Sequence, residues 1–260
     1  MGLIILGGIG FVVFTNIAQK IRFARKGQIF YLSLHVKIVL ISTVVLIVSG
    51  FVFTFISFYK TSLWELPLSK RILTALFESV TLRTAGFETI PQTSFTSSAS
   101  LFHLILMFIG GSPGSIAGGV KTTTAFITLL YLLDGNEQRT TVSFANRRIP
   151  STIINKSITI VSRSVLILLI SAISLSYVEN HLISNGTISL IDIIYESVSA
   201  LATVGLSRGL TPQLSFLGKL IIIITMYIGR TGIYAMSIKS GFTGSDNEDL
   251  IYPEESLLVG

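Results

Sequence analysis

Residues 77–87 read Phe-Glu-Ser-Val-Thr-Leu-Arg-Thr-Ala-Gly-Phe, and residues 195–206 read Tyr-Glu-Ser-Val-Ser-Ala-Leu-Ala-Thr-Val-Gly-Leu. In both stretches Glu-Ser-Val comes shortly before Thr-x-Gly, and the second copy has one more residue between the two motifs. Each copy ends a short helix-like segment that lies between two longer apolar runs. Internal duplication of a membrane unit predicts a pseudosymmetric pathway between the copies.

The composition places most of the chain in lipid. Half of the 260 residues are hydrophobic and only 12% are charged, whereas soluble domains carry roughly a quarter of charged residues. The chain has no cysteine, which excludes disulfides and thiolate chemistry. Its Lys and Arg residues lie in short segments between apolar runs rather than along one solvated face, so we expect no nucleic-acid partner.

The predicted fold class is an all-α integral membrane protein with two repeats of helix, re-entrant pore helix, filter loop and helix, preceded by the end of an earlier span. A membrane-crossing helix needs about 20 apolar residues, and the helical segments before the two Thr-x-Gly motifs are shorter than that. The predicted units are 1–32 (end of a span and cytoplasmic linker), 33–140 (one repeat), 141–240 (the other repeat) and 241–260 (cytoplasmic tail).

Within these units we expect short pore helices at about 71–82 and 189–202, followed by filter loops at 84–87 and 203–206. The segment 98–133 is predicted to be a broken helix, because its centre is rich in Gly and contains Pro. The last span is predicted at 217–238.

The distribution of basic residues predicts the orientation. Segments 20–37 and 135–156 together carry nine Lys and Arg residues, whereas 60–71 carries three and 178–192 none. Short loops rich in Lys and Arg stay in the cytoplasm. We therefore expect both filter loops to open to the outside and the acidic tail, 241–260, to be cytoplasmic.

The Thr-x-Gly segments are candidates for an ion filter. Irregular backbone survives at membrane depth only where it is buried in protein or lines a watery path. Glycine permits a positive φ, which lets carbonyl groups turn towards an ion, and rings of carbonyls replace the hydration shell of potassium. An ordinary turn would explain one such segment, but two copies favour a filter. The predicted K⁺-coordinating residues are Thr84, Ala85, Gly86, Phe87, Thr203, Val204, Gly205 and Leu206.

The chain resembles the C-terminal half of the membrane subunits of the Trk/Ktr superfamily of potassium uptake transporters, which includes the plant HKT transporters. The resemblance rests on residues 77–89, 110–124, 195–207 and 226–232 and covers nearly the whole chain. It implies four repeats in one polypeptide, of which this chain would hold the third and fourth. We favour a fragment over a chain whose missing half comes from another polypeptide.

The Gly-rich break at 110–119 has two interpretations, a packing kink or a mobile gate. The resemblance favours the gate. The gate residues that it implies are Gly110, Gly111, Ser112, Gly114, Gly118, Gly119 and Lys121. Lys121 could equally snorkel to the interface.

Arg230 lies within the last apolar run, where an isolated charge costs at least ~2.5 kcal/mol and usually faces a cavity or a partner. Snorkelling to the inner interface is the alternative. The resemblance implies that Arg230 contacts the intramembrane loop and forms an electrostatic barrier in the pore.

Glu78 and Glu196 recur at matching places, and we expect them to support the filter by bonding backbone or hydroxyl groups behind it. Arg83 is expected either to brace the filter loop or to lie exposed at its mouth. No nucleophile–base pair, metal-ligand spacing or nucleotide motif is present in the sequence, so we expect neither an enzyme nor a bound cofactor.

The predicted function is potassium uptake, passive or coupled to Na⁺ or H⁺, through a carbonyl-lined filter gated by the Gly-rich loop. The alternative is a non-conducting half-transporter or accessory subunit. The expected partners are the lipid bilayer and either the missing N-terminal repeats or a second copy. The resemblance also implies a homodimer with a cytosolic nucleotide-binding regulatory subunit. The expected location is the plasma membrane of a bacterium, as a multi-pass protein.

Overall fold

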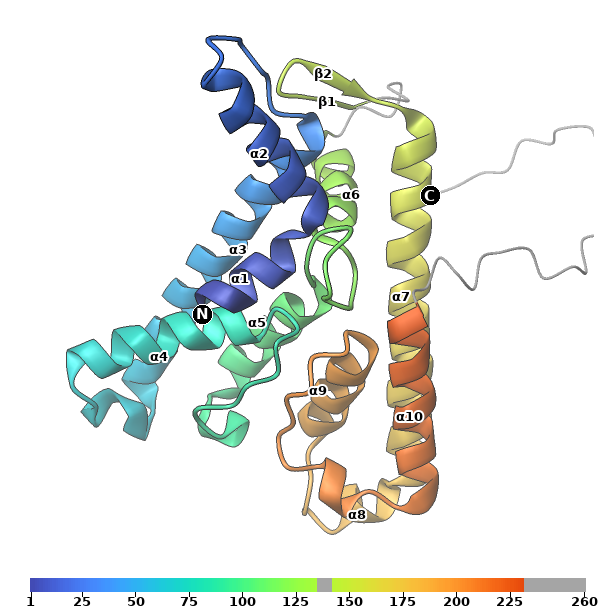
Figure 1. The fold of residues 1–260 in the computed structure, drawn as a ribbon. Coiled ribbons are helices and arrows are strands. Elements are labelled where there is room, and N and C mark those ends of the chain that lie inside the picture. Colours follow the sequence, from blue (N-terminus) through green and yellow to red (C-terminus); the bar gives the residue numbers. More distant parts are fainter. Residues whose placement is uncertain (135–141, 232–260) are drawn as a thin grey trace, which may run out of the picture.

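The computed structural model describes residues 1–134 and 142–231, and these form a helical assembly (Figure 1). The helices are α1 (Gly2–Ile9), α2 (Phe11–Ala24), α3 (Leu34–Ser57), α4 (Leu68–Thr81), α5 (Ser97–Phe108), α6 (Thr122–Asp134), α7 (Ser151–Val178), α8 (Asn180–Ser184), α9 (Leu190–Leu201) and α10 (Phe216–Thr231). Two short strands, β1 (Val142–Phe144) and β2 (Arg147–Ile149), pair in an antiparallel hairpin.

Within residues 1–134 and 142–231, two helices are long and apolar enough to cross a membrane, or three spans result if the bent pair α1 and α2 is one span. The two long helices are α3, with 24 residues, and α7, with 28 residues. The helices on either side of the predicted break, α5 and α6, are apolar but shorter. The predicted last span, 217–238, corresponds to α10 up to residue 231. Its remainder and the predicted tail, 241–260, lie outside the described residues.

The N-terminal apolar stretch, which the sequence predicts as the end of a span, is bent. Helices α1 and α2 meet at an angle of 94°. Gly10, at the break, has φ +85°, and an added β-carbon there would lie 2.7 Å from the carbonyl oxygen of Pro113. The bend therefore has two causes, a left-handed backbone that favours glycine and the close approach of a distant loop.

The short helices α4 and α9 occupy the positions where the sequence predicts pore helices. They have 14 and 12 residues, and each is followed by one of the Thr-x-Gly segments. Helix α9 begins with a capping box between Ser189 and Asp192, which satisfies backbone donors at its start. The C-terminal half of α4 and most of α9 are buried, so both helices end inside the protein.

One buried cluster joins the two copies. It contains residues from the ends of α4 and α9, from α5 and from the second Thr-x-Gly segment: Leu82, Leu106, Met107, Tyr195, Val198, Ala202, Val204 and Leu206. Helix α5 packs against both α3 and α9, and α7 lies beside α10 (Figure 1). The hydrophobic core thus lies directly behind the candidate filter segments.

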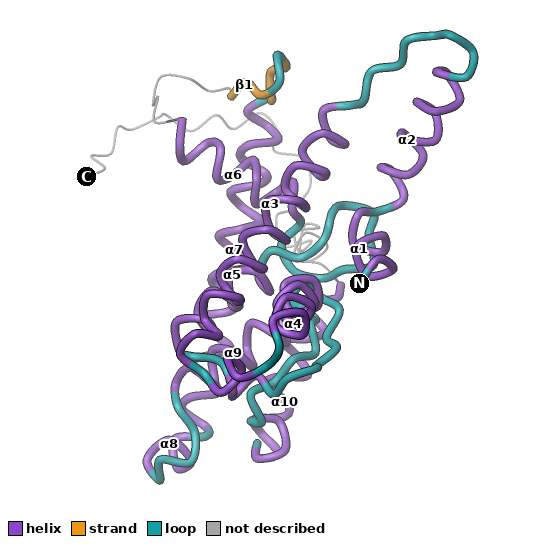
Figure 2. The backbone as a smooth tube through the Cα atoms, turned by 90° about the vertical axis from the view of Figure 1, so that its left-hand side faces the viewer, coloured by secondary structure: helices purple, strands orange, loops and turns teal. Residues whose placement is uncertain are grey.

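The basic connections lie at one end of the molecule. The loop after α2 and the β1–β2 hairpin are together at the top of both views, whereas α8 lies at the opposite end (Figures 1 and 2). The sequence does not predict the hairpin. Its turn residues, Ala145 and Asn146, both have positive φ, as a tight two-residue hairpin turn requires.

Close packing of α3 against α4 generates the first prediction. An added β-carbon at Gly50 would lie 2.5 Å from Ser79 Oγ, a hydroxyl that donates to the carbonyl oxygen of Ile47 at 2.7 Å. Gly50→Ala should therefore lower the free energy of unfolding by about 1–3 kcal/mol, as overpacking does. Gly2→Ala is the matched control, because a β-carbon at Gly2 has nothing within 4 Å. Equal thermal midpoints for the two variants in detergent would contradict this packing.

Candidate functional site

The two candidate filter segments share one unusual backbone conformation. Thr84 and Gly86 have φ +63° and +73°, and Thr203 and Gly205 have φ +52° and +96°. Positive φ is a genuine outlier for a β-branched residue such as threonine. Such strain, about 1–3 kcal/mol per residue, persists only where the surrounding structure imposes it, and it clusters at functional sites. Its recurrence at the same motif position indicates a shared role.

The two segments meet through their backbones. A β-carbon added at Gly86 would overlap the carbonyl oxygen of Val204 and lie 3.4 Å from the α-carbon of Gly205. At Gly205 the nearest neighbour of an added β-carbon is the α-carbon of Gly86, at 3.9 Å. No side chain therefore separates the segments at this contact, and their peptide groups lie against each other.

The side chains of the two segments differ in exposure. Val204 and Leu206 are buried in the core cluster behind the second segment. In contrast, the Phe87 ring is 62% exposed. The structure brings the two segments together at Gly86, Val204 and Gly205, and the two segments are anchored differently.

A hydroxyl group in each short helix fixes the segment that follows. Thr81 Oγ1 accepts a hydrogen bond from the backbone N–H of Phe87 and donates to its carbonyl oxygen, both at 2.8 Å. Ser199 Oγ accepts from the N–H of Gly205 at 3.2 Å. Sequence reasoning missed both residues. The sequence does hold a signal for both hydroxyl residues, because Thr81 and Ser199 each lie three positions after the repeated Glu of their copy.

The two repeated glutamates bond to different groups. Glu196 accepts hydrogen bonds from the hydroxyls of Ser207, at 2.7 Å, and Thr211, which is the kind of partner expected. Glu78 is fully buried and accepts from the side-chain amide of Gln92 at 2.9 Å. The expectation of a backbone or hydroxyl partner is therefore wrong for Glu78, because Gln92 reaches back from the loop after the first segment.

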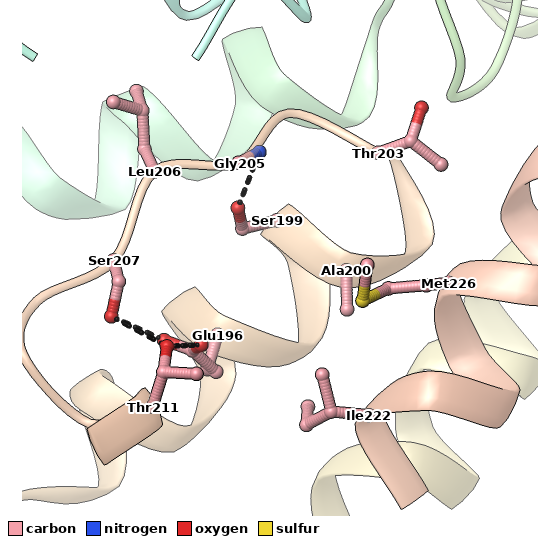
Figure 3. A pocket seen from close by; sticks show the side chains of 10 residues that line it. All are labelled: Glu196, Ser199, Ala200, Thr203, Gly205, Leu206, Ser207, Thr211, Ile222 and Met226. Carbon is pink, nitrogen blue, oxygen red and sulfur yellow. Dashed lines mark hydrogen bonds between the residues drawn. The ribbon is translucent and has the colours of Figure 1, made fainter. Parts of the chain in front are cut away.

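A pocket of about 290 Å³ lies beside the second segment, between α9 and α10. Figure 3 shows Glu196, Ser207 and Thr211 hydrogen-bonded on one side, with Ala200, Ile222 and Met226 on the other. The remaining lining residues are Ser199, Thr203, Gly205 and Leu206. The Glu196 carboxylate thus bonds the Ser207 and Thr211 hydroxyls at the edge of the pocket, beside the second segment.

The Gly-rich loop between α5 and α6 closes on itself. Ile109 pairs with Val120, and the N–H of Gly110 donates to the carbonyl of Val120 at 3.0 Å. The N–H of Thr122 donates to the carbonyl of Gly111 at 3.0 Å. The break in the helix is therefore a hydrogen-bonded loop, which satisfies backbone groups that lipid could not.

This loop lies directly against both candidate filter segments. An added β-carbon at Gly118 would overlap Thr203 Oγ1, and one at Gly110 would lie 3.4 Å from Thr84 Cγ2. The loop is also tied to the bent N-terminal helices, because the N–H of Ser112 donates to the carbonyl of Gly8 at 2.9 Å. The glycines here permit close approach to the filter segments.

Three cationic side chains donate to carbonyls of this loop. Arg230 Nη1 donates to Ile116 at 3.0 Å, and Lys121 Nζ donates to Ala117 at 2.5 Å. Arg83 Nη2 lies 3.4 Å from the carbonyl oxygen of Gly110. Arg83 is only 7% exposed, and this contact is with the Gly-rich loop, whereas the sequence predicts bracing of the filter loop or exposure at its mouth.

Arg208, two residues after the second segment, is a further residue that sequence reasoning missed. It donates through Nε to Asp192 Oδ1 at 2.6 Å. Asp192 lies at the start of α9, outside the spanning helices. Partial burial works to raise the pKa of Asp192, but hydrogen bonds from Arg208 and Ser189 outweigh it and hold the pKa below its usual value. No local motif marks this pair.

The histidines of the described residues form no metal site. His103 is buried, and its Nε2 lies 3.2 Å from Thr54 Oγ1. Within 1–134 and 142–231, no group of three or more His, Cys, Asp or Glu residues could hold a metal ion.

The contact between the segments predicts unequal effects of two alanine substitutions. Gly86→Ala adds a β-carbon onto the carbonyl oxygen of Val204, whereas Gly205→Ala adds one where space remains. Both strain the backbone, so Gly205→Ala is the matched control for strain. We expect Gly86→Ala to reduce the free energy of unfolding by about 1–3 kcal/mol more than Gly205→Ala does. The reverse order in thermal unfolding would show that the segments do not meet in this way.

Comparisons with known proteins identify the family of the chain. Residues 1–242 match the family described as "TrkH: Cation transport protein". The chain is 33% identical to the potassium/sodium uptake protein NtpJ of Enterococcus hirae, over 99% of this chain and 56% of that protein. It is 31% identical to the Ktr system potassium uptake protein B of Bacillus subtilis, over 99% of this chain and 55% of that protein.

The solved structure of the potassium transporter TrkH from Vibrio parahaemolyticus matches the fold with a TM-score of 0.69 at 18% identity. The match covers 92% of this chain and 51% of that one. The chain thus spans about half the length of the relatives it matches. The matching family consists of transport proteins and not of enzymes. The chain belongs to this TrkH family of cation transport proteins.

Proposed function

We propose that the chain supplies two walls of a pore for potassium uptake, and that segments 84–87 and 203–206 are its filter. The observation that carries this proposal is the backbone contact between two segments with the same positive-φ pattern. Peptide carbonyls exposed by such a conformation can replace the water around K⁺ without any charged side chain. The names of relatives that take up potassium support the same ion.

The short helices add to the attraction for a cation. Helix α4 ends at Thr81 and helix α9 at Leu201, only a few residues before Thr84 and Thr203. The C-terminal end of a helix carries a partial negative charge of about half a unit. Both helices would therefore favour a cation at the filter.

In this proposal the Gly-rich loop, 110–119, is the gate below the filter. It touches Thr84 and Thr203 and is bonded by Arg230, Lys121 and Arg83, so its position can change access to the filter. Arg230 would add an electrostatic barrier to cations, because its positive charge is held against the loop by the bond to Ile116. Movement of the loop away from Arg230 would lower that barrier.

The proposed orientation places both filter segments towards the outside. The basic loop after α2 and the β1–β2 hairpin lie at the same end, which we assign to the cytoplasm of a bacterial cell (Figure 1). The acidic tail would then be cytoplasmic. Uptake could be passive or coupled to Na⁺ or H⁺, and the partners would include a second copy and a nucleotide-binding regulatory subunit.

The matched relatives are longer than this chain, and this difference motivates one alternative function. The relatives are nearly twice as long as the matched region, and a filter needs walls on all sides. The chain could therefore be a non-conducting half that needs another polypeptide, or further repeats, to complete the pore. Flux of ⁸⁶Rb⁺ through the purified chain in liposomes separates the two functions. No flux from the chain alone, with flux restored by a co-purified membrane partner, would support the half-transporter.

The filter assignment predicts a specific loss of selectivity in Gly205→Ser. The control is Gly209→Ser, because Gly209 also has positive φ and open space around it but lies outside the filter segment. We expect only Gly205→Ser to lower discrimination of K⁺ against Na⁺, because only that residue belongs to the coordinating backbone. Competition of Na⁺ with ⁸⁶Rb⁺ uptake measures this. Similar losses of K⁺/Na⁺ discrimination in both variants would show that backbone strain causes the effect, and would contradict the filter assignment.

The gate assignment predicts that Arg230→Gln raises the rate of cation flux several-fold, since it removes both the barrier and a bond to the loop. Lys219→Gln is the control, because it removes one positive charge from the same helix at a distance from the loop. Selectivity should stay as in the unmodified chain for both variants. Unchanged or lower flux in Arg230→Gln, with normal expression, would rule out a barrier at this residue.

A further inference from the structure

A single guanidinium group also joins residues that flank the two filter segments. Arg208 Nη1 donates to the carbonyl oxygen of Gln92 at 2.8 Å and to Ser100 Oγ at 2.7 Å, while its Nε donates to Asp192. Asp192 belongs to α9, which precedes the second filter segment. Gln92 and Ser100 belong to the stretch that follows the first segment. Arg208 therefore links two units that are more than 100 residues apart in sequence.

A second, buried link runs through the side chain of Gln92. Its Nε2 donates to Glu78 of α4 at 2.9 Å, and its Oε1 accepts from the hydroxyl of Tyr195 of α9 at 2.8 Å. Gln92 is only 1% exposed, and its backbone N–H donates to Glu88 at 2.9 Å. Its amide therefore has partners on both of its polar atoms, and its backbone is fixed in place. Arg208 thus bonds the backbone carbonyl of Gln92, a residue that these hydrogen bonds hold in position.

Burial makes the arginine link stronger than an ordinary surface ion pair. The side chains of Arg208 and Asp192 are 12% and 17% exposed. Exposed pairs contribute little because water and salt screen them, whereas a pair with this little exposure is less screened. The planar guanidinium presents several donors in a fixed geometry, which lysine cannot reproduce.

We propose that Arg208 is a positioning residue for ion selectivity, which fixes the second filter segment at a set distance from the first. The proposal rests on the proposed function, because it concerns the discrimination between K⁺ and Na⁺ at that filter. Arg208 follows Leu206 by two residues, so its movement would be passed to Gly205 and Val204 through the backbone. Discrimination by a carbonyl filter depends on the spacing and number of its carbonyl dipoles.

The test compares Arg208→Gln and Arg208→Lys with Lys219→Gln in the complete chain, using ⁸⁶Rb⁺ uptake into liposomes in competition with Na⁺. Arg208→Gln should lower K⁺/Na⁺ discrimination by roughly three- to tenfold, because it removes charge-assisted hydrogen bonds between the walls. Arg208→Lys should recover little of it, since lysine keeps the charge but not the fork. Lys219→Gln should behave as the unmodified chain, which controls for loss of one positive charge.

A thermal double-mutant cycle between Arg208→Gln and Ser100→Ala tests the link without any transport. We expect non-additive shifts of the thermal midpoint, because the two residues share one hydrogen bond. Coupled shifts with unchanged selectivity would overturn the proposal and leave Arg208 a structural residue. Full recovery of selectivity by Arg208→Lys would also overturn it, in favour of a charge effect. An unmodified chain that conducts no Rb⁺ would instead support the non-conducting half-transporter over a pore formed by this chain, and the cycle would then record only a structural link.

Discussion

The contact between the peptide groups of Gly86 and Val204 is the constraint on which the rest of the structure depends. Two backbones can approach this closely only if neither carries a side chain at the contact and both are held in place from behind. The hydroxyls of Thr81 and Ser199 hold each segment on its own short helix. The buried cluster that joins α4, α5 and α9 then fixes the two helices relative to each other.

Lipid makes a second demand, because it offers no hydrogen bonds to irregular backbone. The Gly-rich loop meets this demand internally, by pairing Gly110 with Val120, and externally, through Arg230 and Lys121. Both cations donate hydrogen bonds to backbone carbonyls of this loop, Arg230 to Ile116 and Lys121 to Ala117. The loop is therefore held both by its own backbone hydrogen bonds and by a few side-chain contacts, which the proposed gate would exchange on opening.

Much of this arrangement could be predicted from sequence, because its signals are local. The duplicated motifs, the two short helices and the broken helix each follow from composition and spacing within about 30 residues. The bend at Gly10 could not be predicted, since it depends on the approach of Pro113 from more than 100 residues away. Arg208 was missed for the same reason, because nothing near it in sequence reveals Gln92 and Ser100 as its acceptors. The predicted type of hydrogen-bond partner is wrong for Glu78. Its partner is the side-chain amide of Gln92 in the loop after the first segment, and no sequence pattern marks such a contact.

The central claim is that the backbones of residues 84–87 and 203–206 coordinate one cation between them. Anomalous diffraction from crystals of the protein grown with Tl⁺ in place of K⁺ tests this claim most directly. The account predicts a thallium peak that lies within coordination distance of oxygens from both segments. A peak bound only at the carboxylate of Glu196, or no peak along the two segments, would contradict it.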